Sequence, residues 1–232
     1  MRKAINTSVG LFASCFEPPG PVLEVGSLYL EGYEAISDLR PYFRGREYIG
    51  CDLRQGLGVD RIEDAEGLSF ERESFGTVLM FELLEHLQHP DRALSEAHRI
   101  LREDGLLALS VPFDYRLHGF PTDYWRFTPS GIHTLLKQFP QKVVFALGPR
   151  GKPAFVFAVA AKGREDFERR RHEFEAQAHV TFRRSRRRGY VSAFKGFGRE
   201  LGGLVLGRAQ LGAAFFDPAQ GGGLFPYREE EP

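Results

Sequence analysis

The chain has 232 residues, of which 42% are hydrophobic and 27% are charged, and its formal net charge is zero. This length suits one large domain, or one domain with an appendage, whose core needs neither disulfides nor metals. Zero net charge gives no overall field that would attract nucleic acid. The two cysteines, Cys15 and Cys51, lack zinc-ligand spacing, so we expect no metal and a reducing, cytoplasmic setting.

Residues 1–20 are interpreted as a lead-in segment. Their mildly apolar stretch is interrupted by Asn6, Thr7 and Ser8, so we do not interpret it as a signal peptide. The sequence contains no run of about 18 apolar residues, so no helix is expected to span a membrane.

Strand-like and helix-like patterns alternate from residue 21 to residue 162. Short apolar runs predict seven strands, at residues 21–26, 47–53, 58–64, 75–82, 105–112, 142–148 and 154–162. Helical spacing predicts helices at residues 33–43, 91–104 and 128–139, the last with Thr128 as N-cap and Pro129 at its first position. The joint between the last two strands is too short for a crossover helix, which predicts an antiparallel pair.

This order of elements predicts a doubly wound, Rossmann-like α/β fold. Its seven-stranded sheet is expected to be mostly parallel, with a late antiparallel strand. The sheet and its helices define a domain over residues 21–162, followed at residues 163–232 by a basic helical and glycine-rich extension that we expect to be partly flexible. In such sheets ligands bind beyond the carboxyl ends of the strands.

The residues that end each strand are therefore the candidate ligand contacts. Gly26 follows the first strand, where a glycine lets the backbone approach a ligand closely. Asp52 ends the second strand, where an acid commonly accepts hydrogen bonds from both hydroxyls of a ribose. The third and fourth strands are followed by Asp64, Ala65, Phe81 and Glu82. One such residue alone is common in turns and helix caps, but the ordered set at successive strand ends seldom arises by chance.

From residue 20 to residue 162 the sequence resembles the class I S-adenosylmethionine-dependent methyltransferases. "VLEVGS" is similar to the first motif of that family, and "YIGCDLRQGLGVD" is similar to its ribose motif. Residues 63–112 resemble the long central signature. "HGFPTDYWRFTPSGI" resembles the motif His-x-x-Pro-x-Asp-Tyr-Trp-Arg-Phe-Thr-Pro of a subgroup found among polysaccharide and cell-envelope genes.

The first loop departs from the family's Gly-x-Gly pattern. After Gly26 the next glycine is Gly32, and Glu31 stands where the subgroup has asparagine. We expect a longer loop in which Gly32 replaces the missing glycine near the helix start. S-adenosylmethionine has no phosphate, so this loop and the nearby Glu24 suit it better than NAD, whose pyrophosphate needs a glycine-rich helix N-terminus.

The resemblance implies S-adenosylmethionine as the cofactor and assigns its contacts. The methionine part would be lined by Glu24, Gly26 and Ser27, the ribose held by Asp52, the adenine contacted by Leu53, Asp64 and Ala65, and the floor closed by Phe81 and Glu82. The implied acceptor is a small molecule, a sugar or a lipid-linked glycan, methylated at oxygen.

An oxygen nucleophile benefits from a nearby base. The candidate bases are His118, Asp123 and His86, and the candidate acceptor contacts are Tyr124, Trp125 and Arg126. Simpler roles remain open for these residues. Asp123 and Arg126 can pair to brace the loop, Trp125 and Phe127 can be core anchors, and His86 can cap or pack within its helix.

The arginines of the extension are dense at residues 169–171 and 183–188. A solvated helix, a basic surface for anionic lipid at a membrane, and a partner or self-association interface all fit this pattern. Nucleic acid ranks lower, because no nucleic-acid-binding motif accompanies the arginines. The main alternative to an enzyme is a non-catalytic binding protein on the same fold, and a dinucleotide oxidoreductase is disfavoured by the missing phosphate loop.

Overall fold

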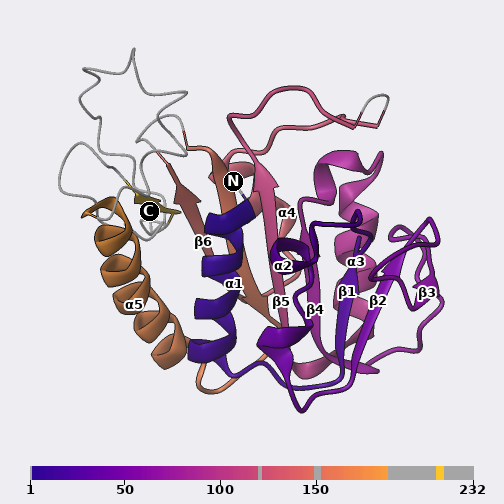
Figure 1. Ribbon diagram of the computed structural model, residues 1–232. Coiled ribbons are helices and arrows are strands. Elements are labelled where there is room, and N and C mark those ends of the chain that lie inside the picture. The colour runs from indigo at the N-terminus through magenta and orange to yellow at the C-terminus, as the bar shows by residue number, and fades with distance from the viewer. Residues whose placement is uncertain (1, 120–121, 149–152, 188–212, 217–232) are drawn as a thin grey trace.

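The computed structural model describes residues 2–119, 122–148, 153–187 and 213–216. Within them, strands form one sheet in the order β3-β2-β1-β4-β5-β7-β6-β8 (Figure 1). They are β1 (Val22–Val25), β2 (Tyr48–Asp52), β3 (Arg61–Ile62), β4 (Phe75–Phe81), β5 (Leu101–Pro112), β6 (Gln141–Leu147), β7 (Phe155–Ala161) and β8 (Ala213–Phe216). Only β7 runs antiparallel to its neighbours, β5 and β6. The predicted Rossmann-like sheet is confirmed, and β8 extends it beyond β6.

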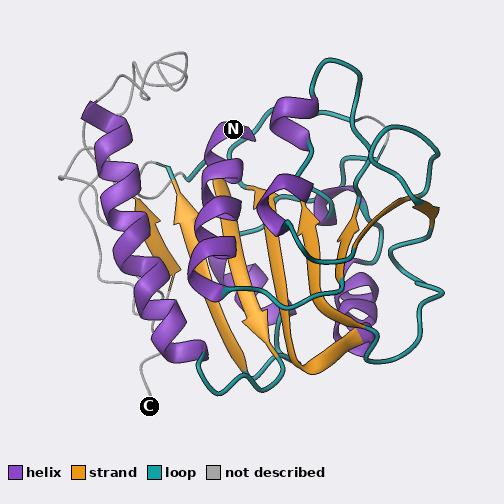
Figure 2. Ribbon diagram, turned by 60° about the horizontal axis from the view of Figure 1, so that its bottom comes forward, coloured by secondary structure: helices purple, strands orange, loops and turns teal. Residues whose placement is uncertain are grey.

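Helices cover both faces of this sheet (Figure 2). One face carries α1 (Arg2–Phe16) and α5 (Phe167–Arg187), which lie side by side, and the other carries α3 (Pro90–Ile100) and α4 (Pro129–Leu135). Burial on both faces explains why the central strands are apolar without alternation: all seven residues of β7 are buried. The three layers leave the strand ends, with their loops, as the place for polar chemistry.

The N-terminal segment is more than a lead-in, because most of it forms a helix that belongs to the core. Phe12 and Phe16 of α1 are fully buried. The ring of Phe16 lies 5.5 Å from that of Phe167 and 5.9 Å from that of Phe174, both on α5. The sequence of residues 2–16 did not show which face of this helix is buried. That face packs on α5, which lies far from α1 in the sequence.

Several predicted boundaries are wrong. The helix expected at residues 33–43 is two short pieces, α2 (Glu34–Ser37) and the 3-10 helix η1 (Arg40–Phe43), because Pro41 cannot continue an α-helix. The helix expected at residues 91–104 ends at Ile100, since Leu101 is extended and pairs with Phe75. The third strand and the helix after residue 128 are also shorter than expected.

The predicted cap of α4 is confirmed. Thr128 has extended backbone angles and its hydroxyl accepts a hydrogen bond from the Gly131 N–H at 3.0 Å, with Pro129 following. We expect Thr128→Ala to lower the free energy of unfolding by about 1 kcal/mol, because one amide of the first turn loses its acceptor. Thr134→Ala on the same helix is the control: this exposed hydroxyl only bonds back to the Ser130 carbonyl, so its loss is expected to be neutral. Urea denaturation measures both, and equal effects would contradict the capping role.

The first arginine cluster of the extension is already paired. Arg170 bonds to Asp166, to Glu17 at 2.8 Å and to the Cys15 carbonyl at 2.8 Å, so it ties α5 to the end of α1. Arg171 pairs with Glu168 and Glu175. The second cluster, at residues 183–188, lies outside the side chains that the structure describes, as does most of the tail. None of the described helices is long and apolar enough to cross a membrane.

Candidate functional site

The loops that follow β1, β2, β4 and β5 meet at one edge of the sheet, because these strands are mutually parallel. Nearly all of the predicted site residues lie at this edge. It also carries most of the large apolar side chains that the described part of the chain leaves exposed, among them Leu30, Tyr33, Leu53, Leu57, Leu117, Tyr124 and Trp125. Exposed apolar groups gathered in this way are typical of a ligand-binding surface.

The loop after β1 turns sharply and leans on the loop after β2. Gly26 has a φ of +82°, which favours glycine, and its N–H donates to the Cys51 carbonyl at 2.8 Å. Ser27 is buried against Gly50, where even a methyl group would lie 2.7 Å from the serine oxygen. The Tyr29 N–H donates to the Leu57 carbonyl at 3.1 Å. This loop is thus longer than a Gly-x-Gly turn, as the sequence predicted.

Gly32 lies further along the same loop. It too has a left-handed backbone, with a φ of +83°, and its N–H donates to the Glu34 carboxylate at 2.9 Å at the start of α2. No atom lies within 4 Å of where its side chain would begin, so the turn requires glycine for its backbone angle and not for space. The structure therefore places Gly32 near the helix start, exposed to solvent.

Glu24 is a carboxylic acid inside the sheet. Its side chain is buried in the middle of β1 and accepts a hydrogen bond from the Tyr48 hydroxyl at 2.7 Å. Burial raises the pKa of Glu24 to about 7, although the bond from Tyr48 acts in the opposite direction. A carboxyl with a pKa near neutral can gain or lose a proton, or become charged to pair with a cationic group, at small energetic cost.

Asp52 ends β2 as predicted. Its Oδ1 accepts a hydrogen bond from the Arg54 N–H at 3.0 Å, which holds the carboxylate in place at the strand end. The next side chain, Leu53, is 61% exposed and offers an apolar surface beside it. Asp64 accepts a bond from the Glu66 N–H at 2.9 Å and so forms a turn, and Ala65 is buried. Asp52 and Leu53 thus lie at the end of β2, and Asp64 and Ala65 follow β3.

Glu82, directly after β4, has an unusual backbone. Its φ is +52°, which is uncommon for a residue with a side chain and is often found at functional sites. Two bonds to Ser110 on β5 hold it: its N–H donates to the Ser110 carbonyl, and its Oε1 accepts from the Ser110 hydroxyl, both at 2.9 Å. The preceding ring, Phe81, stacks on Phe157 at 5.8 Å, so it belongs to the sheet's packing as well as to this edge.

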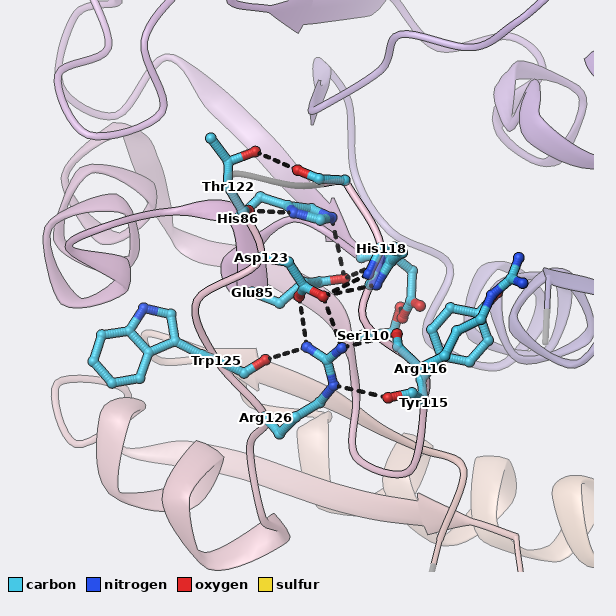
Figure 3. A network of polar contacts seen from close by, with 12 residues as sticks. Glu85, His86, Ser110, Tyr115, Arg116, His118, Thr122, Asp123, Trp125 and Arg126 are labelled. Carbon is cyan, nitrogen blue, oxygen red and sulfur yellow. Dashed lines mark hydrogen bonds and ion pairs between the residues drawn. The ribbon is translucent and has the colours of Figure 1, made fainter.

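Glu85, His86 and His118 form a polar cluster just beyond Glu82 (Figure 3). Glu85 Oε1 lies 3.8 Å from His86 Nε2 and 3.9 Å from His118 Nε2. Glu85 is fully buried, and burial together with the nearby Glu82 raises its pKa to about 9. Burial also lowers the pKa of His118, although Asp123 opposes this. His86 lies in the 3-10 helix η2 (Leu84–His86), before α3, so it does not pack within that helix.

Asp123 and Arg126 brace the loop after β5. Two hydrogen bonds, of 2.6 and 2.9 Å, join the guanidinium to the carboxylate. The carboxylate also accepts a hydrogen bond from the backbone N–H of His118 at 2.8 Å. These bonds hold the pKa of Asp123 well below its usual range, so this carboxylate is a poor base. The remaining N–H groups of Arg126 donate to the carbonyls of Tyr115, Arg116 and Trp125, which leaves the guanidinium no donor for an acceptor phosphate.

The aromatic residues next to Asp123 and Arg126 are either buried or exposed. Phe127 is buried, as a core anchor would be. Trp125 is 44% exposed and Tyr124 is 43% exposed, so neither is a core anchor. The Trp125 indole N–H donates to the Leu87 carbonyl at 2.8 Å, which fixes the ring at the surface. These two side chains are available to an acceptor.

Sequence reasoning missed Glu85, the most deeply buried member of the cluster. The available signal was its place in "FELLEHL", where a charged residue lies between leucines that are expected to be buried. A carboxylate in such a run is either exposed by the local turn or retained for its chemistry.

Comparisons with known proteins agree with the fold. Residues 38–109 match the family model of a methyltransferase domain. A possible histamine N-methyltransferase from Thermotoga maritima superposes with a TM-score of 0.52 at 22% identity, covering 68% of this chain and 89% of that one. A 1,6-didemethyltoxoflavin N1-methyltransferase from Burkholderia thailandensis, with S-adenosylhomocysteine bound, gives 0.54 at 18% identity, covering 68% and 77%.

A third structure, an S-adenosylmethionine-dependent methyltransferase from Archaeoglobus fulgidus, gives a TM-score of 0.53 at 15% identity, covering 69% of this chain and 94% of that one. No curated protein sequence matches the chain. Residues 38–109 are therefore similar to a methyltransferase domain, and the chain has the Rossmann-like fold of these S-adenosylmethionine-dependent methyltransferases.

Proposed function

We propose that the protein transfers the methyl group of S-adenosylmethionine to an oxygen atom of a small-molecule, sugar or lipid-linked glycan acceptor. The observation that carries this proposal is the sequence of groups along one edge of the sheet. A glycine turn follows β1, a fixed carboxylate ends β2, and a cluster of two partly exposed imidazoles and a buried carboxyl follows β4 and β5. Contacts to the methyl donor and to the acceptor would thus lie on neighbouring strand ends.

The half of the site that binds the methyl donor would be formed by residues at the ends of strands β1 to β4. Glu24, Gly26 and Ser27 would surround the methionine part, with the Glu24 carboxylate as counter-charge for its ammonium group. Asp52 would accept hydrogen bonds from the ribose hydroxyls, and the exposed Leu53 would cover the adenine. Asp64 and Ala65 would meet the adenine edge. One structural neighbour, the Burkholderia enzyme, holds S-adenosylhomocysteine, which supports the choice of donor.

The acceptor half would be the cluster and its aromatic rim. The donor is already activated, so catalysis consists mainly of aligning the nucleophile with the methyl group, which can supply about 7–11 kcal/mol. An acceptor hydroxyl must also lose its proton, and the cluster of Glu85, His86 and His118 is placed to receive it. The exposed rings of Tyr124 and Trp125 would hold the body of the acceptor. A membrane-bound acceptor remains a prediction that rests on residues 183–188.

A non-catalytic binding protein on the same fold is the second candidate. It is favoured by the loop after β1, which packs on the loop after β2 through Tyr29 and Leu57 and so departs from the usual glycine turn. This candidate predicts that the donor binds weakly or that it binds without turnover.

Calorimetric titration with S-adenosylmethionine, S-adenosylhomocysteine and NAD tests the proposed function. We expect micromolar binding of the first two and none of NAD. We expect Asp52→Ala to weaken donor binding about 10- to 100-fold, since a hydrogen bond to a charged acceptor contributes about 1.5–3 kcal/mol.

Asp91→Ala is the matched control, because this exposed aspartate lies in the first turn of α3 and is not among the proposed donor contacts. A folded protein that binds neither methyl donor nor product would overturn the proposed enzyme. Donor binding with no methyl transfer to any hydroxylated acceptor would favour the second candidate.

A further inference from the structure

Two histidines and a glutamate converge at the polar cluster from separate parts of the chain. Glu85 and His86 lie in η2, and His118 lies in the loop after β5. One ligand atom from each residue lies within 4.8 Å of the other two. Figure 3 shows the two rings and the carboxylate turned toward a common point. This convergence is produced by the fold alone, because nothing in the spacing of the three residues indicates it.

The Glu85 carboxylate lacks a partner that its burial calls for. Its side chain is 0% exposed, and neither oxygen has a hydrogen-bond partner among the described residues. Buried charges in proteins are normally paired or bound to a metal, because an isolated one is costly. A neutral carboxyl is not satisfied either, since the two nearest imidazole nitrogens lie beyond hydrogen-bond distance of Oε1. A cation between Glu85 and the two imidazoles would satisfy the carboxylate directly.

The His86 ring is already arranged as metal-binding imidazoles usually are. Its Nδ1 lies 2.6 Å from the Thr122 carbonyl oxygen, which can only accept, so Nδ1 carries a proton and Nε2 is the nitrogen left to bind a metal. The ring also packs on Gly119, where a methyl group would lie 2.9 Å from the ring carbon Cε1. Both contacts aim Nε2 at Glu85.

The His118 ring has a similar arrangement. Its Nδ1 lies 3.2 Å from Asp123 Oδ2, without the alignment of a hydrogen bond, while its Nε2 faces Glu85. Asp123 is itself held by Arg126. A carboxylate behind the imidazole is a common outer partner of a metal ligand, because it fixes the ring and strengthens its donor nitrogen.

We propose that Glu85, His86 and His118 form a binding site for a divalent first-row transition metal, with Glu85 Oε1 and the two Nε2 atoms as ligands. Two ligands about 2.1 Å from a tetrahedral zinc ion lie about 3.4 Å apart. The observed 3.8 and 3.9 Å need to close by only a few tenths of an ångström. Imidazole nitrogens favour zinc, iron, copper or nickel over magnesium or calcium.

Three protein ligands leave coordination positions open, as catalytic metal sites do. This role rests on the proposed function: an acceptor hydroxyl that occupies an open position would lose its proton more readily because the metal polarises it. With metal bound, the two imidazoles are ligands and the proton leaves to another base or to water. Binding of the metal itself requires nothing of the acceptor.

Calorimetric titration of the full chain, first stripped by a chelator, with Zn²⁺ tests the site. We expect one ion per chain with a micromolar or tighter Kd. We expect His86→Ala, His118→Ala and Glu85→Gln each to weaken binding at least about 100-fold, since changes to outer partners alone cost about 10- to 100-fold. His89→Ala is the matched control, because this exposed histidine lies three residues from His86 outside the cluster, and we expect no change.

Co²⁺ bound to the wild type provides a readout that does not depend on variants. We expect visible absorption bands typical of cobalt with nitrogen and oxygen ligands, lost when Zn²⁺ is added. A wild type that binds neither ion overturns the site, as does a folded His86→Ala variant that binds Zn²⁺ as well as His89→Ala does.

Titration of the metal-free protein with S-adenosylmethionine separates the two proposals. Donor binding without zinc binding would leave the proposed function standing and remove the metal site. Zinc binding without donor binding would do the reverse.

Discussion

Phe174→Ala is expected to lower the free energy of unfolding by about 3–5 kcal/mol, the usual range for removing a buried aromatic ring. Phe174 is 2% exposed, and its ring lies 4.9 Å from that of Phe145, 5.9 Å from that of Phe16 and 6.1 Å from that of Phe157. These rings come from β6, α1 and β7, so one side chain joins α5 to the opposite end of the chain and to the sheet. Truncation leaves a cavity that three separate elements cannot close.

Val180→Ala on the same helix is the control, because Val180 is 48% exposed and its loss is expected to change stability by less than about 0.5 kcal/mol. Urea or guanidinium denaturation of the full chain measures both variants. Similar small effects for the two would contradict the docking of α5 and would make it a solvated appendage.

The docking of α1 and α5 is the part of the fold that the sequence predicted least well. The alternating strands and helices at residues 21–162 follow from local periodicity, and the sheet confirms them. The pairing of α1 with α5 does not, because Phe16 and Phe167 are far apart in sequence and each helix alone shows only a weak apolar face. Similarly, the end of α3 is set by the pairing of Leu101 with Phe75 on another element.

The candidate site also contains residues that local sequence predicts and residues that only distant contacts explain. Asp52 was predictable because a strand end fixes its place, and a single strand is a local feature. The roles of Asp123 and Arg126 were left open by the sequence, and the structure shows the two groups paired to brace the loop. Glu85 was missed because its importance depends on His118, which the β5 loop brings to it from a distant part of the chain.

Glu24→Gln is expected to stabilise the protein at alkaline pH and to weaken donor binding. Burial raises the pKa of Glu24 to about 7, whereas an unfolded glutamate titrates near its ordinary value of about 4.3. Between these two values the native state keeps a proton that the unfolded state releases. The free energy of unfolding therefore falls as pH rises through this window, by up to about 3 kcal/mol, and levels off above it.

Glutamine remains neutral, and its amide oxygen can still accept the Tyr48 hydroxyl, which Glu24 now accepts at 2.7 Å. The variant is thus expected to match the wild type near pH 4.5 and to be about 3 kcal/mol more stable at pH 8. Glu31→Gln, an exposed change of the same kind, is expected to leave the pH profile unaltered. Denaturant titrations from pH 4.5 to pH 8 measure this, and an unchanged slope in Glu24→Gln would contradict the buried titration.

The same variant connects stability with the proposed function. If the Glu24 carboxylate is the counter-charge for the ammonium group of S-adenosylmethionine, its replacement removes a charge-assisted hydrogen bond and should weaken donor binding about tenfold or more. Gain of stability with loss of affinity would show that the buried acid is retained for the ligand at the expense of the fold. Gain of stability with unchanged affinity would place Glu24 outside the donor site and leave Asp52 as the main anchor of the cofactor.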